Sequence, residues 1–302
     1  MANANGWGDG ASNNNIGWGK GADNAIGWGS VYSVSSAGAT DIVGTPAPPP
    51  TDPDAQAFIT AASITDPTQQ SAINTLVTDL KGYNIWTKFK AIYPIVGGSA
   101  SSHKWNLKDP RDLNAAFRLV FSGGWTHSST GALPNGTNAY ADTFLNENTI
   151  LTLNNEHLSY YSRTNNTGAF GEMGILDNTI AGNPGTHIHA KWTDGNFYPR
   201  ANDNNGGIVN SNTSQGLFIT NRTNATQVRA FRNNVLQLVT SNSIQKVNLK
   251  VYIGALNRVG TDVFHTTRQC AFASIGDGLT DTEAANLYTA VQAYQTTLSR
   301  NV

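Results

Sequence analysis

Two aromatic segments contain the side chains of this chain that are best suited to bind a ligand. His187-Ile-His189 lies in a run that predicts a β-strand, so both imidazoles point to one face and Lys191 follows on that face. Two histidines at this spacing can share a metal ion, but no third ligand is evident. We therefore expect glycan contact or ordinary surface pairing here, and no metal site.

Aromatic side chains near these histidines suit a sugar, because sugar rings stack on aromatic faces while polar groups bind their hydroxyls. Trp192, Asp194 and Tyr198 follow directly in the sequence. Trp125 and His127 are expected together in a loop at the end of another strand. These five residues, with the two histidines, form the predicted glycan site. The alternative is that Trp125 and Trp192 only pack in the core or at its edge.

Carboxylate spacing argues against catalysis. Glycoside hydrolysis needs two carboxyl groups about 5–10 Å apart on either side of the scissile bond. Glu147, Glu156, Glu172 and Asp177 are available, but they are scattered and no alternating Glu-x-Asp-x-Glu run occurs. These four residues are better explained as solvated carboxylates or as caps of turns, so we expect that the protein is not an enzyme.

Oxygen-rich turns are the remaining candidates for a cofactor. Asp194-Gly-Asn196 and Asn202-Asp203-Asn204-Asn205 offer the ligand oxygens that Ca²⁺ prefers, although a polar turn has the same composition. The chain contains no Gly-x-x-x-x-Gly-Lys nucleotide loop. We expect no cofactor, and Ca²⁺ is an alternative that nothing else in the sequence supports.

Alternating hydrophobicity with frequent turn residues predicts that residues 97–278 form an antiparallel jelly-roll β-sandwich. Asn233-Asn234 separates two strands and suits a hairpin turn, because Asn tolerates positive φ. Tyr160 and Tyr161 face opposite ways on one strand, so at most one of them can be external. The candidate strands are 117–121, 149–153, 157–163, 171–176, 186–193, 217–221, 227–231, 235–240, 249–255 and 269–275.

Helical patterns flank the sandwich on both sides. Asp52 and Asp66, each followed by Pro, predict helix starts in a helical block at 54–96, which ends in a turn-rich piece at 85–92. Thr280 and Glu283 form a capping box that opens a C-terminal helix within 279–302. Its apolar stripe is expected to pack on the sandwich or the helical block, with a coiled-coil seam as the alternative.

Composition excludes several classes of function. The net charge is −1 and only 13% of the 302 residues are charged, so no basic patch indicates nucleic acid or anionic membrane. The single Cys270 rules out an intramolecular disulfide framework, and we expect it to be buried as a small apolar side chain. Neither a signal peptide nor a membrane span is evident, although the Asn- and Thr-rich polarity is common in extracellular β-proteins. Release inside a virus particle would reconcile these features.

The first 44 residues differ from the rest of the chain. Three Gly-Trp-Gly units place Trp7, Trp18 and Trp28 eleven and ten residues apart in a polar, Gly-rich strip. Such a strip has too little apolar surface to collapse alone, but each Trp can bury a large area in another protein's groove. We predict an anchor at 1–44, followed by a Pro-rich linker at 45–53. A disordered low-complexity leader is the alternative.

The closing segment resembles concanavalin A-like (laminin-G-like) jelly rolls. The resemblance depends on Val251-Tyr-Ile-Gly-Ala255, Ala271-Phe-Ala-Ser-Ile275 and Gly278-Leu-Thr-Asp-Thr-Glu283, preceded by the hairpin Arg232-Asn-Asn-Val-Leu236. It covers about residues 215–285. A central strand with an aromatic-Ile-Gly motif and a last strand that leads into a short capped helix are typical of that family.

Most of the chain resembles virion proteins of tailed phages that infect Bacteroidota, the crAss-like phages and their relatives. The matching segments are the Gly-Trp-Gly leader, Thr65-Asp-Pro-Thr-Gln-Gln-Ser, Ile85-Trp-Thr-Lys-Phe-Lys and Phe121-Ser-Gly-Gly-Trp-Thr-His-Ser. The resemblance implies a head or tail fibre or spike subunit, made in the bacterial host cytoplasm and carried on the particle surface. It also implies other virion proteins as partners of residues 1–44, a host surface glycan as ligand and a homotrimer, with the 53–92 helices as the expected trimer contact. A structural capsid or collar protein and a carbohydrate-active enzyme are the alternatives.

Overall fold

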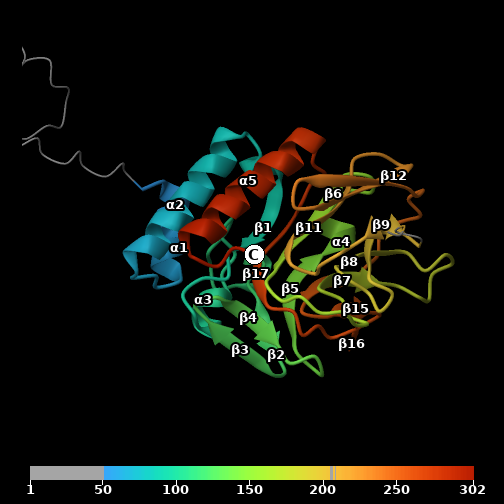
Figure 1. The fold of residues 1–302 in the computed structure, drawn as a ribbon, viewed down its shortest axis with the longest axis horizontal. Helices are drawn as coiled ribbons and strands as arrows, with labels where there is room; N and C mark the ends of the chain where they lie inside the picture. Colours follow the sequence, from blue (N-terminus) through green and yellow to red (C-terminus); the bar gives the residue numbers. More distant parts are fainter. Residues whose placement is uncertain (1–50, 205–206, 208) are drawn as a thin grey trace, which may run out of the picture. The chain divides into compact units, whose positions relative to one another are not determined.

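The structure, a computed structural model, describes residues 51–204, 207 and 209–302. Residues 51–302 form one compact unit in which two β-sheets pack face to face and a layer of helices covers one sheet (Figure 1). The predicted mainly β, antiparallel jelly-roll sandwich with a C-terminal helix is confirmed. The anchor predicted at 1–44, with Trp7, Trp18 and Trp28, and most of the 45–53 linker lie outside the described residues.

The first sheet has eight strands. In spatial order they are β13 (Val235–Thr240), β12 (Gln227–Arg232), β11 (Gly216–Arg222), β6 (Glu156–Ser162), β17 (Cys270–Gly276), β4 (Gly131–Pro134) and β3 (Trp125–Ser128), with β1 (Phe89–Tyr93) paired to β17. The predicted Asn-Asn hairpin joins β12 to β13, since Arg232 pairs with Val235 and Asn233 has a φ of 55°.

The second sheet has nine strands and carries the candidate site. In spatial order they are β10 (Val209–Asn210), β9 (Asn196–Asp203), β8 (Gly185–His189), β7 (Met173–Leu176), β14 (Lys250–Ile253), β5 (Tyr140–Asn146) and β2 (Val120–Ser122). β15 (Leu256–Arg258) pairs with β16 (Thr261–Val263) and also, in parallel, with β7. All other strand pairings in the two sheets are antiparallel.

Helices cover the outer face of the eight-stranded sheet. α2 (Pro67–Gly82) and α5 (Asp281–Thr297) pack together, and α1 (Pro53–Ala61) packs against α2 (Figure 1). Asp52, Asp66 and Thr280 cap them, and the Thr280–Glu283 capping box is present. The short helices are η2 (Trp86–Lys88), α3 (Ala100–His103), η3 (Asn114–Ala116) and α4 (Glu147–Ile150). No helix within the described part of the chain is long and apolar enough to cross a membrane.

Two hydrophobic cores result from this layering. One fills the space between the sheets, and the other lies between the eight-stranded sheet and the helices. Tyr160 belongs to the first core and Tyr161 to the second, so the two side chains face opposite ways as predicted, and both are fully buried. Cys270 is buried as predicted.

The helical layer also occupies the surface that was expected to join three subunits. Ile73, Leu76 and Leu80 of α2 are fully buried in the core shared with α5 and the sheet. This apolar stripe is therefore covered within the chain and is not available to a partner subunit.

Several predicted elements differ from the structure for local reasons. The segment 149–153 is not a strand, because the Asn146 side chain accepts from the Asn148 N–H and starts α4. The piece expected to be turn-rich at 85–92 ends in strand β1, whose burial on both faces hides the alternation that would reveal it. The strand predicted at 186–193 ends at His189, because residues 192–196 form a turn closed by a 2.7 Å bond from the Trp192 N–H to the Asn196 carbonyl.

Candidate ligand-binding site

The outer face of the nine-stranded sheet brings together side chains from four neighbouring strands. His187 on β8 pairs with Gly174 on β7 and with Arg200 on β9, while Gly174 also pairs with Tyr252 on β14. Residues paired across antiparallel strands point to the same side of a sheet. His187, Arg200 and Tyr252 therefore share one face, and the glycine between them leaves that face open.

Gly174 is required at this position by both its conformation and its neighbours. Its φ is +136°, and a Cβ there would lie 2.3 Å from the Thr186 carbonyl oxygen and 2.5 Å from the His187 Cβ. The absence of a side chain lets the His187 ring lie directly against β7. The floor of the site is thus set by backbone geometry as well as by side chains.

An aromatic cluster lies on the same face, at the end of β8. The rings of His189 and Trp192 are 4.7 Å apart, those of Trp192 and Phe264 are 5.4 Å apart, and the His187 and His189 rings are 4.4 Å apart. Phe264 follows β16, far away in the sequence from the other three. Trp192 and Phe264 are only partly buried, so their rings offer apolar surface to a ligand.

The pair Asp194 and Tyr198 extends this surface across β9. Tyr198 lies opposite His189 in the β8–β9 register, and its hydroxyl donates to the Asp194 carboxylate at 2.5 Å. This hydrogen bond lowers the pKa of Asp194 and raises that of Tyr198. The exposed Asp194 is thereby an ionised acceptor placed beside a partly buried aromatic ring.

Both histidines are neutral at ordinary pH. Burial holds the pKa of His187 well below its usual range and lowers that of His189 to about 4. His189 Nδ1 lies 2.6 Å from the Phe170 carbonyl, so Nδ1 carries the proton and Nε2 is an acceptor. His187 and His189 are only 2% and 7% exposed, so their rings form the buried floor of the site and have little contact with solvent.

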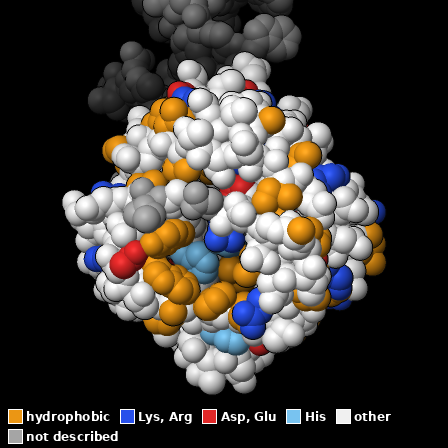
Figure 2. Space-filling model, turned by 90° about the vertical axis from the view of Figure 1, so that its right-hand side faces the viewer, with side chains coloured by type: hydrophobic (Ala, Val, Ile, Leu, Met, Phe, Trp, Pro, Cys, Tyr) orange, Lys and Arg blue, Asp and Glu red, His pale blue; other side chains and the backbone are white. Residues whose placement is uncertain are grey.

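The space-filling view shows this face as a hollow. Figure 2 looks at the side of the molecule where β8, β9 and β15 lie in Figure 1. Hydrophobic side chains ring a depression that has histidine on its floor and a Lys or Arg side chain at its edge (Figure 2). This arrangement fits the cluster described above, in which Trp192, Tyr198 and Phe264 surround the two histidines and Arg200 adjoins them.

The carboxylates nearest to this hollow are engaged by other residues. Glu172 is fully buried and forms a 2.5 Å ion pair with Arg268, which is also fully buried. Asp262 pairs with His265 at 2.7 Å. With Asp194 bound to Tyr198, the described residues place no pair of free carboxylates on this face.

The turns that were considered for Ca²⁺ are used internally. Asp203 is fully buried in a 3.0 Å ion pair with Arg222, and Asn202 donates to the Glu156 carboxylate at 2.6 Å. Asp194 accepts from both Tyr198 and the Asn196 N–H. In the described residues, no three or more His, Cys, Asp or Glu side chains gather in an arrangement that could hold a metal ion.

Trp125 and His127 lie in a second cluster, on β3 of the other sheet. The Trp125 indole N–H donates to the Ser122 and Tyr140 carbonyls, and its ring packs over Gly254, where a Cβ would lie 2.7 Å away. His127 contacts the His103 ring, with the two Nδ1 atoms 2.9 Å apart. The structure therefore brings five of the seven predicted glycan residues together, and it uses Trp125 for packing as in the alternative interpretation.

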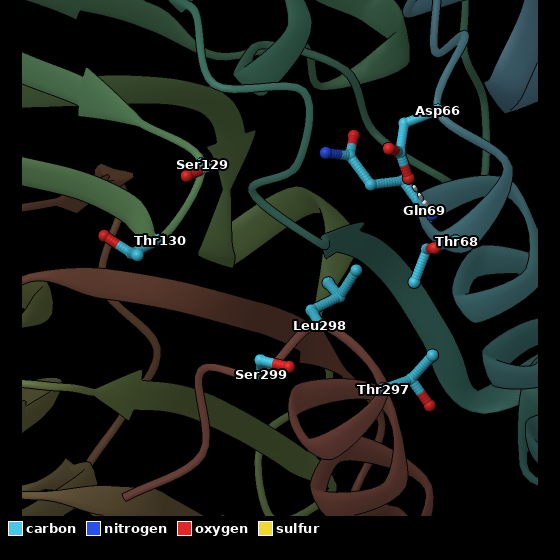
Figure 3. Close-up of a pocket in the computed structure, with 8 residues that line it drawn as sticks. All are labelled: Asp66, Thr68, Gln69, Ser129, Thr130, Thr297, Leu298 and Ser299. Carbon is cyan, nitrogen blue, oxygen red and sulfur yellow. Dashed lines mark hydrogen bonds between the residues drawn. The ribbon is translucent and has the colours of Figure 1, made fainter.

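A shallow groove elsewhere lacks the features of a sugar site. It encloses about 220 Å³ between the start of α2, the β3–β4 turn and the end of α5, and is lined mostly by hydroxyl and amide side chains (Figure 3). Asp66 and Gln69 in this groove serve the N-cap of α2. None of the described residues that line it has an aromatic ring, so they offer a sugar no stacking surface.

Sequence reasoning missed Gly174, Arg200, Tyr252 and Phe264. Arg200 could have been found, because it alternates with Tyr198 along β9, but Pro199 between them obscured the strand. Phe264 reaches the cluster only through the β15–β16 hairpin. No local signal in the sequence relates it to Trp192.

Comparisons with solved structures find β-rich domains of carbohydrate-active enzymes. Domain 4 of AbnA, a GH43 extracellular arabinanase from Geobacillus stearothermophilus in complex with arabinotriose, is 13% identical with a TM-score of 0.43, and the match covers 66% of this chain and 98% of that domain. A mutant Trypanosoma rangeli sialidase that displays trans-sialidase activity is 9% identical with a TM-score of 0.45, over 74% of this chain and 39% of that protein. The NanB sialidase of Streptococcus pneumoniae is 13% identical with a TM-score of 0.31, over 55% of this chain and 27% of that protein. No protein-family model and no curated protein matches the sequence.

Proposed function

We propose that this chain is a non-catalytic, glycan-binding β-sandwich protein that a phage particle displays as a fibre or spike subunit. The observation that carries the binding function is the hollow on the nine-stranded sheet, where Trp192, Tyr198 and Phe264 surround two neutral histidines. The virion role depends on the sequence resemblance and on the Trp-bearing leader, and it has its own test.

The chemistry of the hollow suits a sugar better than a lipid or a peptide. Partly exposed rings of Trp192 and Phe264 provide stacking surfaces for the CH faces of a sugar ring. The Asp194 carboxylate at the rim can accept hydrogen bonds from sugar hydroxyls. A few polar groups placed among aromatic rings are typical of small-ligand sites.

Glycoside hydrolysis is disfavoured by the state of the carboxylates. A hydrolase needs one carboxyl group as acid and a second as base or nucleophile. Near the hollow, Glu172 is bound to Arg268 and Asp262 to His265, which leaves Asp194 alone at the rim. Binding without turnover is the function that this arrangement supports.

A glycan array with the full chain tests the proposal. Wild-type protein is expected to bind a subset of glycans, and Trp192→Ala is expected to reduce that binding at least tenfold because it removes a stacking surface. Trp86→Ala is the matched control, since Trp86 is also partly buried but lies on the helical side against Lys108. Equal binding by Trp192→Ala and wild type would contradict the assignment of this hollow.

The alternative of a purely structural capsid or collar protein predicts a different result. Such a protein would be present in purified particles but would bind no glycan on the array. Release of reducing ends from a capsule polysaccharide by the pure protein would favour the carbohydrate-active enzyme instead.

A further inference from the structure

We propose that the hollow selects an acidic sugar, one that bears a carboxylate, and that Arg200 binds this carboxylate. This inference rests on the proposed glycan binding and specifies the chemical class of its ligand. It depends on the position of Arg200, on the absence of an internal partner, and on the charges around it.

Arg200 occupies the centre of the candidate site. It lies directly across from His187 in the β8–β9 register and two residues after Tyr198, so all three side chains share the open face of the sheet. Its positive charge is close enough to lower the pKa of both His187 and His189. The side chain is partly buried, and this burial lowers its own pKa.

Among the described residues, no side chain or carbonyl accepts a hydrogen bond from the Arg200 guanidinium. Asp203, whose charge raises the pKa of Arg200, forms its ion pair with Arg222 instead, at 3.0 Å. The other buried arginines are fully engaged: Arg268 pairs with Glu172, and Arg300 donates to three carbonyls and one amide. Arg232 and Arg258 also lack an acceptor among the described residues, but Arg200 is the one that lies opposite His187 on the floor of the hollow.

An incoming carboxylate would complete this site. A guanidinium presents its N–H donors in a planar fork that matches a carboxylate with two parallel hydrogen bonds. Partial burial strengthens such a pair, because less water screens it. The neighbouring histidines are neutral, and Glu172 and Asp262 are paired with Arg268 and His265. The ionised Asp194 lies at the rim and is bound to Tyr198, so Arg200 is the positive charge beside the histidines that a ligand carboxylate would meet. A neutral sugar would leave this donor group unpaired, which costs affinity.

The experiment compares acidic and neutral forms of the same sugars with the full-length protein. The probes are oligogalacturonate and oligomannuronate, and their carboxyl-reduced neutral counterparts, measured by titration calorimetry. We expect wild-type protein to bind at least one uronate tenfold or more tighter than its reduced form, with a preference that weakens at high salt. Arg200→Gln is expected to abolish this preference, so that the variant binds the acidic and the neutral form of each sugar equally.

Two controls separate this inference from the proposed function. Arg232→Gln removes an arginine that is also partly buried but lies on β12 of the other sheet, and it should retain the preference. Trp192→Ala should weaken binding to acidic and neutral forms alike. Equal binding of both forms by wild type, or an unchanged preference in Arg200→Gln, would overturn the role of Arg200 while glycan binding stands. Failure to bind any acidic or neutral probe would count against the proposed function itself.

Discussion

Glu147 and Glu156 bury their carboxyl groups against the same hydroxyl, that of Thr186. Both side chains are fully buried, and Glu147 Oε1 and Glu156 Oε2 have no hydrogen-bond donor among the described residues. Burial raises the pKa of Glu147 to about 7, and burial together with the charge of Glu147 raises that of Glu156 well above its usual range. We therefore expect the pair to share a proton in the folded protein at neutral pH.

This pair predicts a pH dependence of stability with a defined sign. An acid whose pKa is raised by folding binds more protons in the native state, so its contribution is complete below pH 4.5 and is lost as pH rises toward about 7. Glu147→Gln removes that loss and keeps a donor for Glu156. We expect the variant to be more stable than wild type by about 1–3 kcal/mol at pH 8 and by little at pH 4.5. Urea unfolding across this range measures the difference, and a difference that does not grow with pH would contradict the shared proton.

Gly174→Ala should damage the floor of the hollow. The added Cβ would meet the Thr186 carbonyl at 2.3 Å, and the φ of +136° is unfavourable for alanine. We expect a loss of about 2 kcal/mol or more in the free energy of unfolding, together with loss of glycan binding. Gly260→Ala is the control, because Gly260 has a φ of +87° but nothing within 4 Å of its Cβ position. It should cost about 1 kcal/mol and leave binding intact; a similar cost at both sites would show that only the backbone angle matters.

Arg300 should be a major contributor to stability near the C-terminus. Its guanidinium donates to the carbonyls of Pro94, Ile95 and Ala271, and so ties the end of the chain to β1 and β17. Arg300→Met leaves the Ile95 carbonyl without this donor, while the Pro94 and Ala271 carbonyls keep only the donors from Tyr294 and Gln295. The substitution should cost about 3 kcal/mol, measured by thermal or urea unfolding. Arg111→Met, which removes an exposed arginine paired with Asp109, should leave the unfolding midpoint unchanged. An unfolding midpoint for Arg300→Met within error of wild type would contradict this role of Arg300 in stability.

Deletion of residues 1–44 tests the virion anchor. The chain without them should be missing from assembled particles, while the melting temperature of the β-sandwich stays the same, because residues 51–302 form a compact unit. Replacement of Trp7, Trp18 and Trp28 by Ala should give the same defect, because these side chains provide the apolar area for docking. Particle composition by mass spectrometry is the measurement, and normal incorporation of either variant would refute the anchor.

Features that depend on a few adjacent residues could be predicted from the sequence. The capping box of Thr280 and Glu283, the Asn233-Asn234 hairpin and the strands β6, β11 and β12 were predicted from local patterns, and the structure contains all of them. The strands that were not predicted include β1, which is buried along nearly its whole length and shows no alternation, and β9, which contains Pro199. In those strands the residues that are buried depend on the layers packed against the strand. These layers come from distant parts of the chain, so the local sequence pattern does not indicate them.

At the site, the local sequence is enough to place His187 and His189 on one face of a strand, followed closely by Trp192, Asp194 and Tyr198. The contacts of Arg200, Gly174 and Phe264 with these residues, and the separation of Trp125 from them, arise only in the folded sandwich. The reason is that these contacts depend on the register of four strands and on a distant hairpin. Strand pairing joins residues far apart in the chain, so it is set by the packing of the whole sandwich and not by any single segment.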